Sequence, residues 1–293
     1  MNNGLKPGFV GGVLDRADQV RTDPERLTEA LGDPRARLLV LDGLDPTLDD
    51  DGRLVWTSLP AAVEAEDLIL LGVDEQGPAF ARLSGDVPDA ATYAPRIWEL
   101  APLLSPDALA LYGCARSLLD WHKRHGFCAN CGTPTRAVKA GWSRSCPGCE
   151  AMHFPRVDPV TIMLAEHDGK ILVGRQPRFP AGRYSALAGF VEPGETIEEA
   201  VARELWEEAG IRVHNVRYVM SQPWPFPSSL MIACIGQTDD PALTLDRTEI
   251  EDAMWVDAAG VRAALAEEEG APFGAPPPMA VAHWLLRNWL DQQ

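Results

Sequence analysis

The sequence contains no long apolar run, and this absence limits where the chain can act. No apolar stretch approaches the roughly 18 residues that a membrane span needs. The opening segment, MNNGLKPGFVGG, also lacks the apolar core of a secretory signal peptide. We therefore expect a protein without membrane contact that works in the cytoplasm.

Basic residues are scarce as well. The chain has 26 Lys and Arg against 43 Asp and Glu, which gives a formal net charge of -17. Binding to a nucleic-acid backbone depends on Lys and Arg side chains that displace counterions. The charge balance therefore argues against bulk affinity for nucleic acid. An anionic substrate would have to be held locally, through bound cations.

Cysteine is sparse, but its placement is informative. Four of the six cysteines form two C-x-x-C pairs in a chain that shows no export signal, which favours a metal site over disulfides. These four are Cys128, Cys131, Cys146 and Cys149. The other two, Cys114 and Cys234, are expected to be free thiols.

The two pairs are separated by 14 residues, the layout of a zinc ribbon with four thiolate ligands. Gly132 and Gly148 lie beside the pairs and permit the tight turns that aim backbone N–H groups at sulfur. A closed shell of four cysteines leaves no coordination position open, so we expect one structural Zn²⁺ per chain. A ribbon that binds nucleic acid is disfavoured by the acidic chain.

The chain, with 293 residues and 46% hydrophobic residues, is long enough for more than one domain. Residues 1–125 contain short apolar runs, RLLVLDG and DLILLGV, separated by Asp-Gly turns, and predict a small mixed α/β domain without a catalytic motif. Helical spacing over residues 106–125 predicts a helix that leads into the cysteine segment, residues 126–155.

Residues 156–293 have a different pattern and form the third expected domain. PVTIMLAE and KILVGRQ flank a His-Asp-Gly turn and predict a hairpin. A long helix ending at Ala209 follows, then strands near RVHNVRYVMSQ and SLMIACIGQT, and a last helix near MAVAHWLLRNWL. The fold class expected for the whole chain is α+β.

One helix carries acidic residues where an apolar face is expected. Thr196 and Glu199 form a capping-box sequence and Gly210 is a C-terminal stop, so a helix is predicted between them. Its apolar stripe continues, at about 100° per residue, into three carboxylates. The stripe comprises Ile197, Ala200 and Val201, and the carboxylates are Glu204, Glu207 and Glu208.

Three carboxylates on an inward face would repel one another unless a cation neutralised them. Oxygen ligands suit Mg²⁺ or Mn²⁺, which keep positions for water and substrate phosphates. Arg203 lies four residues from both Glu199 and Glu207 and is expected to bridge these two carboxylates. The alternative, a solvated acidic face, is disfavoured because Trp206 falls on the opposite side.

The same residues resemble a known family. The pattern G-x5-E-x7-R-E-U-x-E-E-x-G-U, where U is a bulky aliphatic residue, is that of the Nudix hydrolases. This chain fills it at Gly189, Glu195, Arg203, Glu204, Leu205, Glu207, Glu208, Gly210 and Ile211. The resemblance implies an α/β/α sandwich that hydrolyses a nucleoside diphosphate linked to another group, with divalent ions on the diphosphate.

Ten residues after this box comes SQPWPFPSS, which begins at Ser221. Its prolines exclude a regular helix and give a stiff loop that displays aromatic surface, for packing or for a ligand. The stretch resembles the signature of the NADH pyrophosphatase branch of the Nudix family, which also carries a zinc ribbon and a further N-terminal domain. The resemblance implies that substrate is contacted by Gln222, Pro223, Trp224, Pro225, Phe226, Pro227, Ser228 and Ser229.

The resemblance also implies roles for single residues. Arg203 would orient the carboxylates, Glu208 would be the first choice of general base, and Phe190 and Phe154 would sandwich a flat base. Ala282 would join the substrate site. The Mg²⁺ or Mn²⁺ ligands would be the carbonyl of Ala188 and the side chains of Glu204, Glu207, Glu208 and Glu249, with Glu251 as a rival to Glu249.

Two positions depart from the relatives. Phe154 stands where bacterial relatives have Tyr, so stacking is kept and a hydroxyl hydrogen bond is lost. Gly141 stands where relatives can carry an acid that contacts substrate, which removes part of the expected recognition.

The expected reaction is hydrolysis of NADH or NAD⁺ to AMP and (reduced) nicotinamide mononucleotide, with attack by water on the adenylyl phosphorus. The resemblance also implies removal of NAD caps from RNA 5′ ends, and a homodimer. One alternative is a Nudix hydrolase of ADP-ribose or dinucleoside polyphosphates. A second is a non-catalytic nucleotide sensor, which a box with every carboxylate present disfavours.

Overall fold

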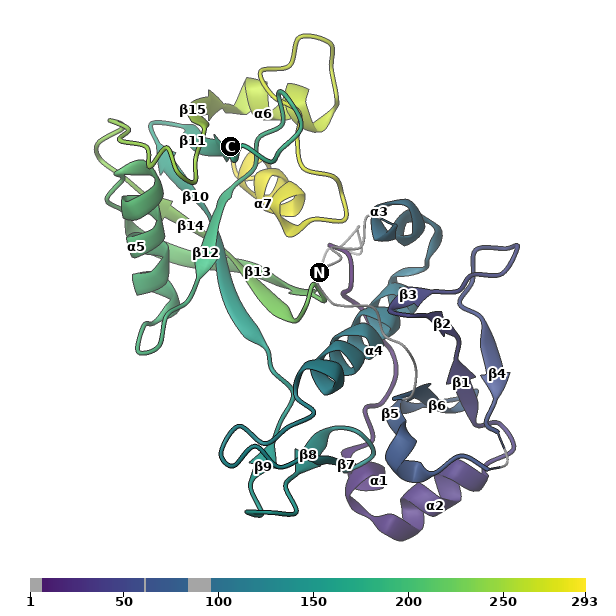
Figure 1. The fold of residues 1–293 in the computed structure, drawn as a ribbon. Helices are drawn as coiled ribbons and strands as arrows, with labels where there is room; N and C mark the ends of the chain where they lie inside the picture. The colour runs from purple at the N-terminus through teal and green to yellow at the C-terminus, as the bar shows by residue number, and fades with distance from the viewer. Residues whose placement is uncertain (1–6, 61, 84–95) are drawn as a thin grey trace. The chain divides into compact units, whose positions relative to one another are not determined.

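The computed structural model describes residues 7–60, 62–83 and 96–293, and it divides into two compact units (Figure 1). One unit holds residues 9–157 together with Trp224–Ser228. The other holds residues 7–8, Asp158–Pro223 and Ser229–Gln293. We refer to them as the ribbon unit and the sheet unit. The expected division at residues 125 and 155 into three domains stays a prediction.

The ribbon unit begins with short elements around a four-stranded sheet of order β4-β1-β6-β5. Strands β1 and β6 are parallel, and the other two pairs are antiparallel. The elements are α1 (Asp18–Thr22), α2 (Pro24–Gly32), β1 (Arg37–Leu39), β2 (Leu41–Asp42), β3 (Asp45–Pro46), β4 (Trp56–Ser58), β5 (Leu68–Asp74) and β6 (Gly77–Arg82). The two quoted apolar runs lie in β1–β2 and β5, as predicted, whereas β3, β4, β6 and both helices were not predicted.

The rest of the ribbon unit contains a long helix and the cysteine segment. The elements are α3 (Ile97–Leu100), α4 (Pro106–Arg124), β7 (Arg136–Val138), β8 (Ser143–Ser145) and β9 (Met152–His153). Helix α4 confirms the helix predicted for residues 106–125. It begins with Pro106, whose missing N–H costs nothing in the first turn. Strands β7, β8 and β9 form a small antiparallel sheet that carries the two cysteine pairs.

The sheet unit is built on a six-stranded sheet of order β13-β14-β10-β11-β15, with β12 paired to β10. Its strands are β10 (Asp158–His167), β11 (Lys170–Arg175), β12 (Leu187–Phe190), β13 (His214–Trp224), β14 (Ser229–Gln237) and β15 (Asp252–Asp257). Strands β10 and β14 are parallel. The predicted hairpin is confirmed: Asp168 and Gly169, both at positive φ, join β10 to β11.

Side chains of β10 alternate between two cores, which places helices on both faces of the sheet (Figure 1). Ile162 and Leu164 pack with residues of α6 (Ala258–Leu265) and α7 (Val281–Leu290). Met163 and Ala165 pack with residues of α5 (Ile197–Ala209). The predicted α/β/α sandwich is confirmed, whereas α6 and β15 were not predicted.

Candidate active site and zinc centre

Helix α5 has well-defined ends. Thr196 Oγ1 accepts a hydrogen bond from Glu199 N at 3.2 Å, and a Glu199 carboxylate oxygen accepts from Thr196 N at 2.7 Å. This capping box was predicted, and a cap of this kind stabilises a helix by about 1 kcal/mol. Gly210 ends the helix at φ 71°. Trp206 is 47% exposed, with the guanidinium of Arg212 4.0 Å from its ring, so it faces outward as expected.

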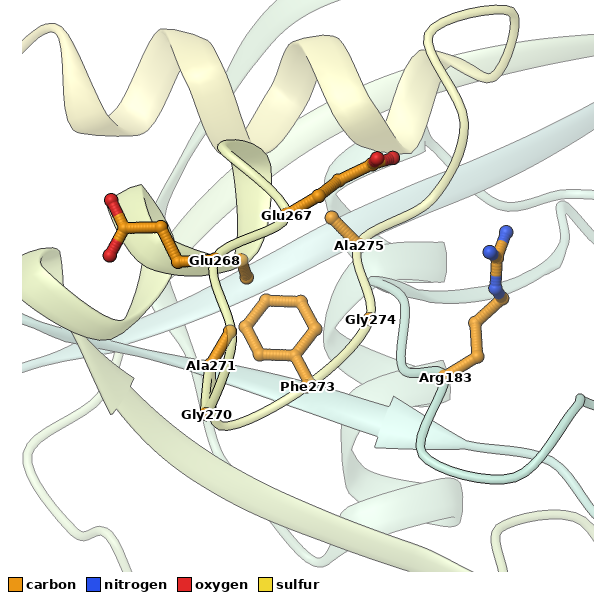
Figure 2. Close-up of a pocket in the computed structure, with 9 residues that line it drawn as sticks. Arg183, Glu267, Glu268, Gly270, Ala271, Phe273, Gly274 and Ala275 are labelled. Atoms are coloured by element: carbon orange, nitrogen blue, oxygen red, sulfur yellow. The ribbon is translucent and has the colours of Figure 1, made fainter.

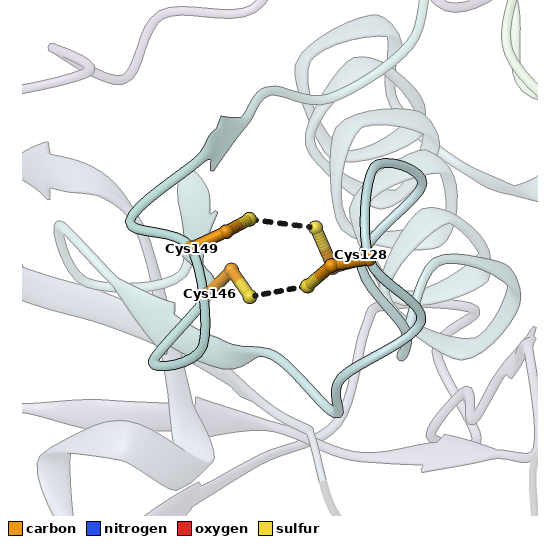
Figure 3. A group of neighbouring side chains, drawn as sticks. Cys128, Cys146 and Cys149 are labelled. Carbon is orange, nitrogen blue, oxygen red and sulfur yellow. Dashed lines mark hydrogen bonds between the residues drawn. The ribbon is translucent and has the colours of Figure 1, made fainter.

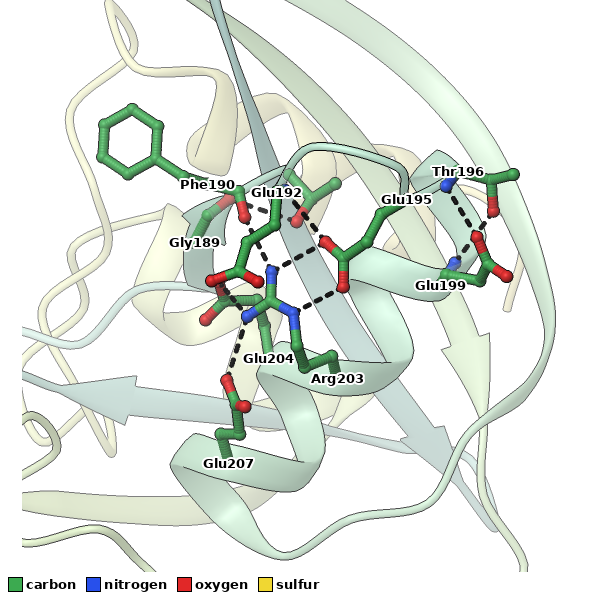
Figure 4. Close-up of polar contacts among 10 residues, drawn as sticks. Gly189, Phe190, Glu192, Glu195, Thr196, Glu199, Arg203, Glu204 and Glu207 are labelled. Carbon is green, nitrogen blue, oxygen red and sulfur yellow. Dashed lines mark hydrogen bonds and ion pairs between the residues drawn. The ribbon is translucent and has the colours of Figure 1, made fainter.

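Arg203 organises the acidic side chains (Figure 4). Its Nε and Nη2 donate to the two carboxylate oxygens of Glu195 at 2.6 and 3.0 Å. Its Nη1 donates to Glu204 and Glu207, each at 2.9 Å, and Nη2 also donates to the Phe190 carbonyl at 2.8 Å. Five contacts match the five N–H groups of a guanidinium. Arg203 therefore fixes three carboxylates and the end of β12 at once.

One expected contact of Arg203 is wrong. Glu199 does not pair with Arg203, because its carboxylate is used in the capping box at Thr196. Glu195, which precedes the helix, takes that place, and the Arg203 guanidinium holds the pKa of Glu195 at about 2. The box pattern contained Glu195, but i,i+4 spacing alone could not select it, since it lies eight residues before Arg203.

Gly189 makes room for Glu204. Strand β12 pairs with β10 so that Gly189 lies opposite Thr161. A Cβ atom built on Gly189 would lie 1.8 Å from the Glu204 carboxyl carbon, which is far inside any possible contact. Position 189 of the box is therefore glycine for a steric reason: the carboxylate of Glu204 lies directly against the β12 backbone.

Glu208 differs from Glu204 and Glu207 because no Lys, Arg or His side chain of the described residues pairs with it. Its side chain is 3% exposed, and its Oε2 has no hydrogen-bond partner among the residues that the structure describes. Burial, together with the charges of nearby acids, foremost Glu204 and Glu249, raises the pKa of Glu208 to about 8. Burial also raises the pKa of Glu204. A buried oxygen without a partner, beside other carboxylates, matches the donor chemistry of a hard divalent cation.

Glu249 and Glu251 are distinguished by their partners. Glu251 receives a hydrogen bond from Arg175 Nε at 2.6 Å, so its charge is already paired. Glu249 is exposed, follows a turn at Asp246 and contributes to the raised pKa of Glu204 and Glu208. The loop reaches this position because the amide of Asp246 donates to the Glu208 carbonyl at 3.0 Å. Glu249 is the better placed of the two, and its role as a ligand stays a prediction.

The four predicted zinc ligands converge (Figure 3). All four sulfur atoms lie within 4.8 Å of one another, with Cys128 Sγ 3.6 Å from Cys149 Sγ and Cys131 Sγ 3.4 Å from Cys146 Sγ. Zn–S bonds of about 2.3 Å in a tetrahedron require separations of this size. Among the described residues, these four cysteines form a group of metal-ligating side chains whose ligand atoms all lie within 4.8 Å of one another. Within the same described residues, the box carboxylates do not form such a group.

Neighbouring groups support the sulfur atoms. Gly148 N lies 3.3 Å from Cys146 Sγ, and Asn130 Nδ2 lies 3.6 Å from Cys149 Sγ. His153 Nε2 lies 3.3 Å from Cys128 Sγ. Donors of this kind reduce the negative charge on thiolates and fix their orientation. The thiols of Cys114 and Cys234 are free, as predicted.

Position 141 lies against the N-terminal sheet. Gly141 has φ +82°, and a Cβ atom there would lie 2.7 Å from the Ile69 side chain and 2.9 Å from the Ile69 backbone. Its carbonyl lies 2.7 Å from His122 Nε2. A side chain has no space at this position without a shift of the Ile69 backbone.

Gln222, expected to contact substrate, is fully engaged with the backbone. It is 1% exposed, its Nε2 donates to the carbonyls of Gly8 and Met279 at 2.9 and 2.7 Å, and its Oε1 accepts from Val281 N at 2.8 Å. These bonds hold the N-terminus of α7. Ala282 lies next to that end and is 2% exposed. A direct substrate contact by Gln222 or Ala282 stays a prediction.

The aromatic part of the signature packs inside the ribbon unit. Trp224 and Phe226 are 5.2 Å apart, and Phe9 lies 5.9 Å from each of them, all edge to face. Pro225 between them is buried, whereas Pro223, Pro227, Ser228 and Ser229 are not. The segment is therefore well packed on one side, and its contact with substrate stays a prediction. Phe190 and Phe154 are 60% and 62% exposed, as stacking residues would be.

A separate concavity lies beside the loop that follows α6 (Figure 2). It has a volume of about 440 Å³, and its lining residues are Arg183, Ala264, Glu267, Glu268, Gly270, Ala271, Phe273, Gly274 and Ala275. Phe273 forms its apolar wall (Figure 2) and is 3% exposed. None of the predicted site residues lines it.

In the described part of the chain no helix is long and apolar enough to cross a membrane.

Comparison with family models gives two adjacent matches. Residues 155–275 match the NUDIX domain, and residues 123–154 match the NADH pyrophosphatase zinc ribbon domain. The first match contains the glutamate helix, and the second contains all four zinc ligands.

Individual relatives extend the likeness over most of the chain. NAD-capped RNA hydrolase NUDT12 of Homo sapiens is 47% identical over 186 residues, which cover 60% of this chain and 40% of NUDT12, so the chain spans about two fifths of that relative. NAD-capped RNA hydrolase NudC of Chromobacterium violaceum is 39% identical and covers 83% of this chain and 90% of its own. NAD(P)H pyrophosphatase NUDT13, mitochondrial, of Homo sapiens is 35% identical, and the match covers 89% of this chain and 79% of NUDT13. The chain therefore belongs to the Nudix hydrolase family, within the group that carries the NADH pyrophosphatase zinc ribbon.

Proposed function

We propose that the chain hydrolyses the diphosphate of NADH and NAD⁺, giving AMP and reduced or oxidised nicotinamide mononucleotide respectively, and that it removes NAD caps from RNA 5′ ends. The observation that carries this proposal is the buried, unpartnered Oε2 of Glu208 at the end of an intact Nudix box. The names of the relatives support the substrate: two act on NAD-capped RNA and one on NAD(P)H. The net charge of -17 favours recognition of the cap over binding of a long RNA.

The residues present fit Mg²⁺ or Mn²⁺. Arg203 already neutralises Glu195, Glu204 and Glu207 in part, while Glu208 has no cation beside it. We propose that Glu204, Glu207, Glu208 and Glu249, with the carbonyl of Ala188, hold the catalytic ions. When bound, the ions would supply electrostatic stabilisation of the charge that develops on the phosphoryl oxygens.

The protein side chains have separate tasks in this reaction. Glu208, the first choice of general base among the box glutamates, takes the proton of the water that attacks the adenylyl phosphorus. The bond from that phosphorus to the bridging oxygen breaks, and nicotinamide mononucleotide leaves. Arg203 keeps the carboxylates in position throughout, and Gly189 keeps the β12 backbone close to Glu204. Phe154 and Phe190 supply exposed rings on which a base can stack.

The Zn²⁺ of the four cysteines is proposed to be structural, since a closed thiolate shell offers no position for substrate. A homodimer and a cytoplasmic location remain proposals that rest on the family resemblance and the sequence. Analytical ultracentrifugation would test the first of these: a single species at the 31.9 kDa monomer mass would contradict the dimer.

The reaction is tested by incubating the protein with NADH and Mg²⁺ or Mn²⁺ in ¹⁸O-water and identifying the products by mass spectrometry. We expect AMP that carries ¹⁸O and unlabelled reduced nicotinamide mononucleotide. In Glu208→Gln the rate should fall by roughly 100-fold to 10,000-fold, the usual contribution of a general base. Glu198→Gln changes an exposed glutamate of the same helix and is the matched control.

Intact NADH in both metals would overturn the assignment. Turnover of ADP-ribose or of dinucleoside polyphosphates under those conditions would then identify the alternative Nudix activity. Label found in nicotinamide mononucleotide instead of AMP would keep the activity and move the attack to the other phosphorus.

A further inference from the structure

Arg116 of α4 is buried without the partners that a buried cation normally has. The residue is 5% exposed, and its Nε and Nη1 have no hydrogen-bond partner among the described residues. Buried charges in proteins are usually paired, because removal from water is costly. Arg116 lies outside the Nudix box and outside the zinc ribbon, and the proposed reaction assigns it no task.

Arg116 lies against Phe226, which belongs to the segment that resembles the signature of the NADH pyrophosphatase branch. The guanidinium carbon lies 4.6 Å from the centre of the Phe226 ring. A cation over an aromatic face is attracted by the ring quadrupole, and the attraction is stronger when both groups are shielded from water. Among the described residues, the Phe226 ring is thus the aromatic face against which this guanidinium lies.

Other residues on the same face of α4 hold the neighbouring parts of the turn. Ser117 Oγ donates to the carbonyl of Pro227 at 3.3 Å. One turn earlier, a Cβ on Gly113 would lie 2.7 Å from Phe9 and 3.4 Å from Pro225. Positions 113, 116 and 117 share one helix face by their i, i+3 and i+4 spacing. Helix α4 therefore lies against three consecutive residues of the turn, Pro225, Phe226 and Pro227.

The aromatic rings of the turn are also held by residues far away in sequence. Phe9 lies edge to face with both Trp224 and Phe226, and Trp98 lies 5.7 Å from Trp224. Among the described contacts, the Phe226 ring lies against Phe9, Trp224 and the guanidinium of Arg116. Loss of the guanidinium would remove the cationic one of these contacts.

We propose that Arg116 is a positioning residue for substrate recognition, which acts by fixing the Phe226 ring and the turn from Trp224 to Ser228. This inference rests on the proposed function, since it assumes that the turn contacts the dinucleotide. A side chain present for stability alone would be apolar at this position, because two buried nitrogen atoms without hydrogen-bond partners oppose folding. Arginine at such a position favours a functional reason for the charge.

The test compares Arg116→Met, Phe226→Leu and the double variant in NADH hydrolysis, with Arg53→Met as the matched control. Arg53 is an arginine of the same unit whose side chain is 76% exposed. We expect Arg116→Met to raise the KM for NADH roughly tenfold with kcat nearly unchanged, since a shielded cation–π contact can supply that factor. The Tm should hold or rise. The double variant should be no worse than the poorer single variant, and Arg116→Lys should recover part of the KM.

Several results would overturn the inference. An unchanged KM in Arg116→Met would do so, and so would additive effects of Arg116→Met and Phe226→Leu. A fall in Tm with parallel loss of kcat would show a purely structural role. If the wild-type protein does not cleave NADH, the proposed function fails. The inference is then decided by equilibrium dialysis of NADH with the same variants, and an equal Kd in wild type and Arg116→Met would contradict it.

Discussion

The zinc ribbon and the glutamate helix each contain several side chains that can bind a metal ion. In the described residues, only those of the ribbon lie close enough together to surround one ion. The four cysteine sulfur atoms lie within 4.8 Å of one another and receive nearby N–H donors. On α5, Arg203 pairs with Glu195, Glu204 and Glu207 and leaves Glu208 buried without a cation.

The difference corresponds to the two uses of a metal. A structural site needs all its ligands from the protein, so the turns of the chain can assemble it completely. A catalytic site must keep positions for water and substrate, so part of its charge stays uncompensated by protein. In this chain the uncompensated charge is on Glu208, whose Oε2 has no hydrogen-bond partner among the described residues. The comparison therefore predicts that the two regions respond to different perturbations.

The largest expected effect is on the ribbon. Cys146→Ser should abolish zinc binding and unfold the ribbon, because structural zinc sites supply about 10–16 kcal/mol of apparent binding free energy in isolated zinc fingers. Zinc content by elemental mass spectrometry and the Tm measure this. Cys114→Ser is the control, since Cys114 lies outside the set. A variant that keeps one zinc per chain and the wild-type Tm would contradict the closed four-cysteine site.

The next effect is on the glutamate helix. In Gly189→Ala the new methyl group would displace the Glu204 carboxylate, whose carbon would otherwise lie 1.8 Å away. We expect kcat/KM for NADH to fall by about 100-fold, the cost of a displacement near 1 Å at a catalytic group. Zinc content should not change. Gly274→Ala is the matched control, because nothing lies within 3.6 Å of a Cβ there. Equal activity in both variants would show that Glu204 can move freely.

A smaller effect concerns pH and the anchorage of the ribbon. Burial lowers the pKa of His122 to about 4, and the ring lies between Arg144 Nη1 and the Gly141 carbonyl, both at 2.7 Å. These partners select the neutral ring, with Nδ1 as acceptor and Nε2–H as donor. A depressed pKa means that this contribution to stability is complete above pH 6.5, the unfolded value, and is lost as the pH falls toward 4.

At pH 5.5 the loss from His122 should be about 1.4 kcal/mol relative to pH 8. Urea unfolding at both pH values checks this, with His122→Gln as the variant in which the pH dependence is reduced. The zinc ligands are the same in both proteins, so the difference between them isolates His122. An identical pH dependence of the unfolding free energy in the two proteins would refute the assignment.

The smallest effect compares the two knuckles of the ribbon. Each has the same backbone turn, from Gly132 N to Cys128 O and from Glu150 N to Cys146 O, both at 2.9 Å. Gly132 has φ 73°, and its counterpart Glu150 has φ 61°, which is strained for a residue with a side chain. Glu150→Gly should stabilise the protein by roughly 1 kcal/mol. A lower Tm in this variant would indicate that the Glu150 side chain has a stabilising contact.

Patterns of local origin could be predicted from the sequence. The hairpin at Asp168-Gly169, the capped helix α5, helix α4 and the zinc ligands all follow from short-range rules of turn chemistry, capping and ligand spacing. The expected pairing of Arg203 with Glu199 was wrong because the capping box competes for the same carboxylate. Helix α6 and strand β15 were missed because their residues lack a clear period and their burial depends on the sheet.

The sequence by itself determined which chemical groups exist and in what order: two cysteine pairs, a glutamate box and a Pro-aromatic segment. Their charge states and partners were decided by tertiary structure, since these depend on which distant residues exclude water. Contact with Ile69 leaves no room for a side chain at residue 141. Gln222 hydrogen-bonds to the backbone carbonyls of Gly8 and Met279. Glu208 is shielded from solvent by the packing of α5. Spacing along a chain cannot encode these effects, because desolvation and steric contact arise between segments that are remote in sequence.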